Sequence, residues 1–357
     1  MSRARDLADL GGSADAGGLT GRNIVINGNM SIAQRGTSST ASGIGCVDRF
    51  QHTLSGGTAT SSQESLSSSD TPYSLGFRNY IRMTNGTTTS AASGQRQIYQ
   101  NIEAQNLAKS GWNYTSTSSY VTVSFWVRSS LAGKYGAYLL TYDGTSQQFS
   151  FTYTLAANTW TKITKTIPGN SNLTFNDDNG LGMSLVVYSW LGTDYTDSTA
   201  TMDAWVANDA TKYFQEDLAD WGGTSSATLD VTAVQFEVGA TATPFEHEDF
   251  GTTLKKCQRY FELLGHATNT SSTNTYSLMS LPFTADTNNQ WIDIPFMVEK
   301  RAAPTSIVAF NGYTVPSATA IGFGTNGMTL YHNAQMTFTK ASGGSQGDAV
   351  ASVSAEL

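Results

Sequence analysis

Carboxylates beside an aromatic residue are the side chains in this sequence that are most suited to catalysis. Glu216, Asp217 and Asp220 come shortly before Trp221, and a pair of carboxylates near an aromatic ring is what glycoside hydrolysis requires. The stretch from Phe214 to Trp221 fits a short amphipathic helix equally well. The sequence places no second carboxylate opposite this group, so we expect a chain without enzymatic activity.

Acidic loops are the second group that could do chemistry. The loop 176–180 carries Asp177 and Asp178 among asparagine and glycine, and loops rich in oxygen ligands bind Ca²⁺. Turns closed by Asx hydrogen bonds explain the same composition. Asp194, Asp197 and Asp203 form a looser acidic group with the same two interpretations. Neither group has EF-hand spacing, so we expect no cofactor, with Ca²⁺ at Asp177 and Asp178 as the alternative.

Histidine and cysteine offer few routes to covalent chemistry. The four histidines are His52, His247, His266 and His332. None lies in a G-x-S-x-G nucleophile turn, and we expect His247 to hold a corner of a domain. Cys46 and Cys257 either pair or remain separate thiols, because two distant cysteines define no disulfide framework. No phosphate-binding glycine loop precedes a helix, so nucleotide binding is not expected.

Sugar recognition requires a less specific set of side chains than catalysis does. Apolar sugar faces can stack on aromatic rings while a few polar side chains bind the hydroxyls. Strand alternation or loop position places five aromatic residues outward, namely Trp112, Tyr114, Tyr188, Trp190 and Tyr195. Comparable residues nearer the C-terminus are Tyr276, Trp291, Tyr313 and Tyr331. Any of them can instead belong to a core or an interface.

A period-two pattern predicts the strands that would position these side chains. The alternation is clearest at Val121, Val123, Phe125 and Val127, which would face a core while their neighbours face outward. Residues 149–155 and 181–187 repeat it. Within 228–239 the apolar set shifts by one position between Val231 and Val234, which indicates a β-bulge or a change of facing sheet.

The spacing of these strands predicts an all-β fold. Short strands separated by Gly, Asn, Asp and Ser turns are typical of sandwiches and jelly rolls, and the chain holds 34 glycines. We therefore expect a jelly-roll β-sandwich over 23–250. Short strands return after residue 265, which predicts a small C-terminal β domain over 266–357.

A change of periodicity predicts a connecting helix over 251–265. Its apolar residues are Leu254, Cys257, Phe261 and Leu264, spaced as the a and d positions of a coiled coil. One interpretation places this seam on the axis of an oligomer; the other packs the helix against its own domain.

The first 22 residues form an anchor and linker in this interpretation. Residues 2–10 can make two helical turns followed by a glycine-rich stretch, and so short a helix orders only against a partner. A docking peptide built on Arg3, Arg5, Leu7 and Leu10 is one interpretation, and a disordered terminus is the other.

Composition excludes several classes of function. The formal charge is −8, with 13% charged residues, and no stretch clusters the Lys and Arg that phosphate binding needs. No apolar run could span a bilayer, and the N-terminus lacks the apolar core of a signal peptide. We therefore expect no nucleic-acid binding and no membrane insertion, with synthesis in the cytoplasm and release by lysis.

Four sequence blocks resemble those of bacteriophage tail fibres and receptor-binding proteins. The blocks are 23–36 (NIVINGNMSIAQRG), 48–50 (DRF), 234–247 (VQFEVGATATPFEH) and 257–261 (CQRYF). They resemble the start, end and following helix of a lectin-like domain in that family. Phe50 and Glu248 depart from the tryptophan and basic residue that are more usual there.

The resemblance implies a structural virion protein that is a homotrimer and attaches the phage tail to a host-surface glycan. It implies a carbohydrate-binding-module-like first domain, a host-facing C-terminal domain, and docking of the N-terminus to an adaptor, nozzle or baseplate protein. Three alternatives remain: a polysaccharide depolymerase, a secreted lectin, and a structural spacer without a ligand.

Overall fold

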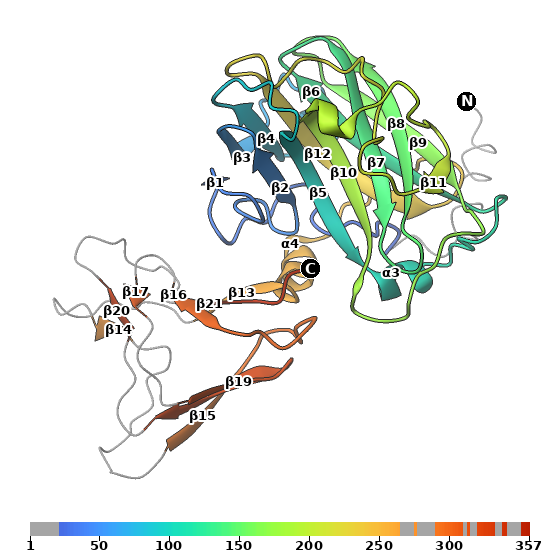
Figure 1. The fold of residues 1–357 in the computed structure, drawn as a ribbon. Helices are drawn as coiled ribbons and strands as arrows, with labels where there is room; N and C mark the ends of the chain where they lie inside the picture. The colour runs from blue at the N-terminus through green and yellow to red at the C-terminus, as the bar shows by residue number, and fades with distance from the viewer. Residues whose placement is uncertain are drawn as a thin grey trace. The chain divides into compact units, whose positions relative to one another are not determined.

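The computed structural model describes residues 21–264, 275–276, 290–309, 313–314, 320–332, 338–340 and 351–357. The predicted docking residues Arg3, Arg5, Leu7 and Leu10 lie outside these ranges. The chain divides into two compact units, the first ending at Phe250 and also including Leu357, the second spanning Gly251–Glu356 (Figure 1).

Two six-stranded antiparallel sheets build the first unit. Sheet A has the order β1 (Ser38–Ser39), β3 (Ala59–Ser65), β4 (Asn79–Asn85), β12 (Thr228–Val238), β6 (Tyr120–Ser129), β9 (Thr161–Pro168). Sheet B has the order β11 (Trp205–Ala207), β8 (Gln147–Leu155), β7 (Gly133–Thr141), β10 (Leu181–Leu191), β5 (Gln95–Glu103), β2 (Gln51–Ser55). Most neighbours in each sheet are distant in sequence, as in a jelly roll. The predicted all-β sandwich is confirmed.

The alternating apolar residues fill the space between the sheets. In β6, Val121, Val123, Phe125 and Val127 are completely buried. On the facing sheet, Phe149 and Phe151 of β8 are each 1% exposed in the same core cluster. Burial of one such side chain stabilises the fold by about 1.5–3 kcal/mol, which is why the period-two pattern dictates strands here.

A β-bulge in β12 explains the shift of its apolar pattern. The pairing of β12 with β6 slips between Thr232 and Gln235, and Ala233 has a φ of 55°. The bulge returns Val234 and Phe236 to the core. Of the two expectations for this segment, the bulge is the one observed.

The opening and closing sequence blocks bind each other. The Glu246 carboxylate accepts hydrogen bonds from the backbone N–H groups of Gly21 and Asn23, the second at 2.8 Å. The Asn23 amide donates to the Val234 carbonyl at 3.0 Å and accepts from the Phe236 N–H at 3.0 Å. We call Asn23, Gln235, Glu237 and Glu246 the clasp.

Buried polar side chains complete the clasp. Gln235 is fully buried, donates to Glu237 at 2.8 Å and accepts from the Glu246 N–H at 2.8 Å. Glu237, 1% exposed, accepts from the Thr243 N–H at 2.9 Å. Hydrogen bonds from the closing block therefore hold the start and the end of the first unit together.

Asn27 and Gly28 have equally specific structural roles. Asn27 has a φ of 61° and donates to the carbonyls of Ile32 and Asp48, both at 2.9 Å. A side chain at position 28 would collide with the Val234 carbonyl, 2.0 Å from an added Cβ. The NGN sequence thus shapes a turn packed against the β12 bulge.

Only short helices interrupt the strands of the described residues. They are α2 (Thr71–Ser74), α3 (Ala104–Ala108), the 3₁₀ turn η1 (Thr193–Tyr195) and α4 (Phe250–Gln258). No helix among them is long and apolar enough to cross a membrane.

The second unit contains three small antiparallel sheets. Their strands, in sheet order, are β13 (Phe261–Leu264), β21 (Ala351–Ser354), β16 (Ile307–Ala309); β14 (Thr275–Tyr276), β20 (Phe338–Lys340), β17 (Tyr313–Thr314); β15 (Gln290–Pro295), β19 (Gly327–His332), β18 (Ala320–Phe323). A buried ion pair lies beside the first sheet: the Lys300 ammonium contacts the Glu262 carboxylate and donates to the Gln258 carbonyl at 2.6 Å.

The predicted connecting helix over 251–265 is present only over its first part. Helix α4 ends at Gln258, and Phe261 and Leu264 lie in β13, paired with β21. Both are buried within their own chain, at 5% and 4% exposure, as is Cys257 at 1%, whereas Leu254 is partly exposed. The run FELL satisfies strand alternation as well as helical spacing, and pairing with a distant strand decided between them. The four residues therefore form no helical seam.

Candidate functional site

Three of the predicted surface aromatics are buried, which corrects their placement. Trp112 is 3% exposed, Tyr188 1% and Trp190 8%. Trp112 packs in the main core, its ring centroid 6.2 Å from those of Tyr114 and Phe175. None of the three can offer an open face to a sugar.

A bulge in β10 separates Tyr188 from Trp190. The pairing with β5 slips between these two residues, so Trp190 joins the main core whereas Tyr188 stays on the outer face of sheet B. Alternation therefore predicted the direction of Tyr188 correctly. It could not predict that this outer face is covered.

The cover is the segment between β10 and β12. Its Tyr213 and Phe214 pack on the outer face, where Gly136 of β7 leaves room for the Phe214 ring, 2.2 Å from an added Cβ. Gln148 of β8 holds the cover in place by donating to the Lys212 carbonyl at 2.9 Å. A second apolar cluster thus lies outside the sandwich core.

Tyrosines dominate this second cluster. The Tyr138 ring stacks on Tyr188 and Tyr213, with centroids 5.3 Å and 4.7 Å away, and Tyr213 stacks on Tyr195 at 6.4 Å. Burial raises the pKa of Tyr138 and Tyr188 well above 10, so both hydroxyls stay protonated. We call Tyr99, Tyr138, Tyr142, Tyr188, Tyr195 and Tyr213 the tyrosine face.

The margin of the tyrosine face is open. Tyr142 is 44% exposed, and Tyr99 and Tyr195 are partly exposed. Tyr99 donates to the Gln51 side chain at 2.9 Å, and its hydroxyl interacts electrostatically with that of Tyr142. Gln97, two residues before Tyr99 on the same face, donates to the Thr53 hydroxyl at 3.0 Å. Aromatic rings and amides are therefore grouped on one accessible margin.

Sequence reasoning found Tyr195 but missed Tyr99 and Tyr142. A signal existed for Tyr99, because the segment QRQIYQN of β5 alternates Gln95, Gln97 and Tyr99 on one face. Tyr142 comes one residue after β7, where alternation gives no direction.

The other predicted aromatics divide into two groups. Tyr114 is partly exposed and packs edge-on against Phe175 at 4.9 Å, away from the tyrosine face cluster. The backbones of Tyr276, Trp291, Tyr313 and Tyr331 lie in β14, β15, β17 and β19. Their side chains lie outside the described part of the structure.

The acidic loops form turns and surface ion pairs. Asp178 accepts from the Gly180 N–H at 2.9 Å, and Asp177 pairs with Lys109 at 2.6 Å. Asp197 accepts from the Thr199 N–H at 2.7 Å, and Asp203 pairs with Lys165 at 2.6 Å. Within the described ranges, no three His, Cys, Asp or Glu side chains gather as metal ligands do. An Asx turn accounts for Asp178, and an exposed ion pair accounts for Asp177.

The carboxylates near Trp221 do not face an aromatic platform. Trp221 is completely buried in the sandwich core. Asp217 pairs with Lys134, and Asp220 accepts from the Gly223 N–H at 2.9 Å. The segment 211–220 forms no helix, so the amphipathic-helix interpretation is also wrong.

Histidines and cysteines take structural positions. His247 packs between Phe77 and Phe245, with ring centroids 5.0 Å and 5.1 Å away, at the predicted corner. His52 is fully buried and binds the Ala41 carbonyl. Cys46 and Cys257, both described, are buried and form no disulfide.

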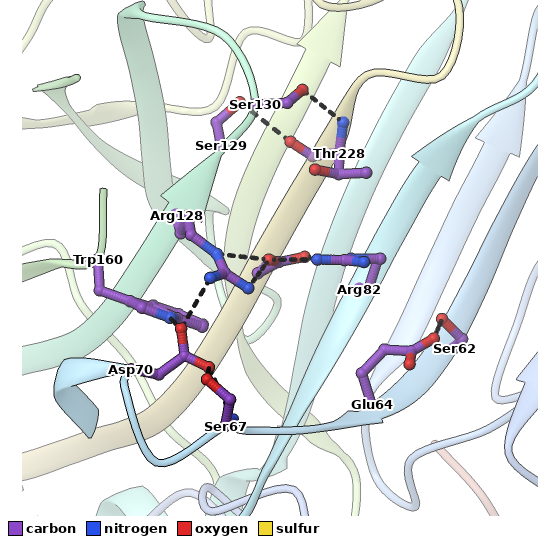
Figure 2. A network of polar contacts seen from close by, with 11 residues as sticks. Ser62, Glu64, Ser67, Asp70, Arg82, Arg128, Ser129, Ser130, Trp160 and Thr228 are labelled. Atoms are coloured by element: carbon purple, nitrogen blue, oxygen red, sulfur yellow. Dashed lines mark hydrogen bonds and ion pairs between the residues drawn. The ribbon is translucent and has the colours of Figure 1, made fainter. Parts of the chain in front are cut away.

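A polar network that the sequence did not reveal lies on the outer face of sheet A. Figure 2 shows Arg82 and Arg128 converging on one carboxylate, with Asp70 and Trp160 beside them. That carboxylate is Asp230, 1% exposed, which accepts from Arg82 Nε at 2.7 Å and Nη2 at 2.9 Å, and from Arg128 Nε at 2.9 Å.

The network also fixes the segment that crosses the sheet. Arg128 donates to Asp70 at 2.9 Å, and the Trp160 indole N–H donates to the same carboxylate at 2.9 Å. Hydrogen bonds from Trp160 and Ser67, together with the Arg128 charge, hold the pKa of Asp70 below its ordinary value despite partial burial. The network joins β4, β12 and β6 to the residues before α2 and so stabilises the fold.

Comparison with known proteins gives only distant likenesses. No protein-family model matches the chain, and no curated protein matches its sequence. Among solved structures, the enzymatically active domain of bacteriophage CBA120 tailspike protein 4 is 11% identical, with a TM-score of 0.32, covering 61% of this chain and 21% of that one.

Two other structures are carbohydrate-binding modules. TmCBM61, solved with β-1,4-galactotriose, is 10% identical with a TM-score of 0.28, covering 62% of this chain and 99% of that module. The N-terminal cellulose-binding domain of Cellulomonas fimi β-1,4-glucanase C is 8% identical with a TM-score of 0.28, covering 59% and 99%. By its own strand order, the first unit of this chain is a two-sheet β-sandwich.

Proposed function

We propose that this chain is a phage tail attachment protein whose first unit binds a host-surface glycan at the margin of the tyrosine face. The observation that carries the proposal is the grouping of Tyr99, Tyr142 and Gln97 on one open margin of sheet B. Rings there can stack on the apolar faces of a sugar, and the neighbouring amides can bind its hydroxyls.

The position of this margin suits recognition better than catalysis. Tyr99 and Gln97 project from the rigid strand β5, and the stack of Tyr138, Tyr188 and Tyr213 lies behind Tyr99. A fixed aromatic loses little conformational freedom on binding. We propose binding without cleavage, so incubation with a host polysaccharide should release no new reducing ends.

Firm attachment would come from several copies acting together. A single aromatic margin gives modest affinity, and linked sites gain through effective concentration. We therefore propose a homotrimer carried on the tail, with residues 1–22 docking to an adaptor, nozzle or baseplate protein.

The test is glycan binding by single-tyrosine variants. After an array identifies a glycan, calorimetry should show Tyr99→Ala and Tyr142→Ala each weakening it about 3- to 10-fold, the range expected for one ring contact. Tyr120→Ala is the matched control, because Tyr120 is 37% exposed at the start of β6 in the other sheet. Unchanged affinity in the Tyr99→Ala/Tyr142→Ala double variant would refute the proposed site.

A further inference from the structure

Four loops meet at one end of the sandwich, which we call the loop end: residues 55–58, 85–94, 192–195 and 221–226. The Gly86 N–H donates to the Thr58 carbonyl at 3.0 Å, and the Thr89 N–H donates to the Gly222 carbonyl at 2.9 Å. The Gly192 N–H donates to the Gly94 carbonyl at 2.8 Å. These bonds hold the loops together over the first residues of β5.

Arg96 lies beneath the loop end and is fully buried. Its Nη1 donates to the carbonyls of Ser55 and Gln95, the second at 3.0 Å. Its Nε and Nη2 make no hydrogen bond to any described residue, and no described carboxylate forms an ion pair with it. Burial lowers the pKa of Arg96, but a guanidinium keeps its proton at physiological pH.

Such a group is costly without a partner. A buried unpaired charge strongly destabilises a fold, and each unsatisfied donor adds to that cost. Two more buried polar atoms at the loop end lack a partner in the described structure, Asn85 Oδ1 and Trp221 Nε1. The loop end is therefore built with polar groups that the described chain leaves unmatched.

The unmatched edge of Arg96 has the geometry of a carboxylate receptor. Nε and Nη2 lie on the same side of a guanidinium and can donate two parallel hydrogen bonds to one carboxylate. The chain itself uses this edge elsewhere, because Arg82 binds Asp230 through Nε at 2.7 Å and Nη2 at 2.9 Å. Arg96 presents the same two donors without an acceptor among the described residues.

Exposed glycine backbone lies beside this edge. Gly57 is exposed, and a Cβ added to it would lie 3.0 Å from Arg96 Nη2. Gly56 is also exposed, with a φ of +78° against +144° for Gly57. The Thr58 and Thr87 hydroxyls, 2.7 Å apart, lie on the same exposed rim. The exposed Gly56–Gly57 turn therefore adjoins the guanidinium.

We infer that Arg96 binds the carboxylate of an acidic sugar at the loop end, as a second glycan site apart from the tyrosine face. This inference rests on the proposed function only because a host-surface glycan is taken as the source of the carboxylate. The two free donors would hold the carboxylate oxygens, and the rim threonines would meet the sugar hydroxyls. The ligand class is then a uronic or sialic acid unit of a surface polysaccharide.

The experiment measures binding of D-glucuronate, D-glucose and acetate to the full chain by calorimetry and thermal unfolding. We expect saturable glucuronate binding with a rise in Tm, weaker acetate binding, and none for glucose. Arg96→Met should weaken glucuronate binding at least tenfold, and Arg96→Lys should weaken it too, because an ammonium lacks the two-donor edge. Arg78→Met is the matched control, since Arg78 is exposed elsewhere.

Failure of this inference and failure of the proposed function give different results. The Tyr99→Ala/Tyr142→Ala variant should bind glucuronate as the unmodified chain does, whatever it does to the array glycan. Absence of glucuronate binding, or full binding by Arg96→Met, would overturn the site. Equal affinity for acetate would overturn the sugar as the source. If Arg96→Met does not fold, a crystal soaked in glucuronate decides, and water alone at Nε and Nη2 overturns the inference.

Discussion

Single residues explain why the sequence blocks look specific. Asn27 satisfies three backbone groups in one turn, and Glu246 holds the N–H groups of Gly21 and Asn23. Asp48, 1% exposed, accepts from the Gln34 N–H at 3.1 Å. A specific sequence motif can therefore reflect the hydrogen bonds that close a β-sandwich.

The Asp230 carboxylate should be the most sensitive charged group of sheet A. Asp230→Ala leaves Arg82 and Arg128 on the sheet without their shared partner, so we expect the free energy of unfolding to fall by about 3–5 kcal/mol. Urea denaturation measures it. Asp177→Ala is the matched control, because its ion pair is exposed and should be worth at most about 1 kcal/mol. Equal effects of the two changes would contradict the structural role of the network.

His52 should make stability depend on pH. Burial lowers its pKa below the ordinary 6.5, despite its bond to the Ala41 carbonyl. The unfolded chain then binds a proton at a higher pH than the folded chain, so the free energy of unfolding falls as pH drops below about 6.5. His52→Gln should flatten this acid-side slope in denaturation at pH 5 to 8. The same slope in both proteins would show that other groups cause it.

At the scale of elements, the sequence predicted the positions of strands better than it predicted which strand faces are buried. Val121 to Val127 could be assigned because both strand direction and burial follow from a local alternation. Tyr188 could not, since its burial depends on Tyr213 and Phe214 folding back over sheet B. Asp230 was missed for the same reason: its partners come from β4 and β6, and only the strand order brings them together.

The end of α4 offers a test of strand against helix. Phe261 is buried in β13, so Phe261→Ala should lower the stability of the second unit by about 3–5 kcal/mol. Leu254→Ala, at a partly exposed helical position, should cost about 1 kcal/mol. Thermal unfolding of the full chain separates the two. Similar losses for both would contradict the burial of Phe261 in β13.

At the scale of the whole molecule, the proposed homotrimer cannot use the expected helical seam, because Phe261 and Leu264 lie in β13. We expect sedimentation equilibrium to give three times the chain mass of 38.1 kDa. A concentration-independent mass of one chain would refute the homotrimer while leaving the tyrosine face untouched.

The clasp also determines where the two ends of the first unit leave the sandwich. Because Glu246 holds Gly21 and Asn23 directly, the two ends of the sandwich leave it at neighbouring points. A domain of that kind can be spliced into an unrelated carrier with little distortion of the host backbone. Residues 21–247 are therefore suited to insertion into a longer chain, or transfer between chains, as one folded unit.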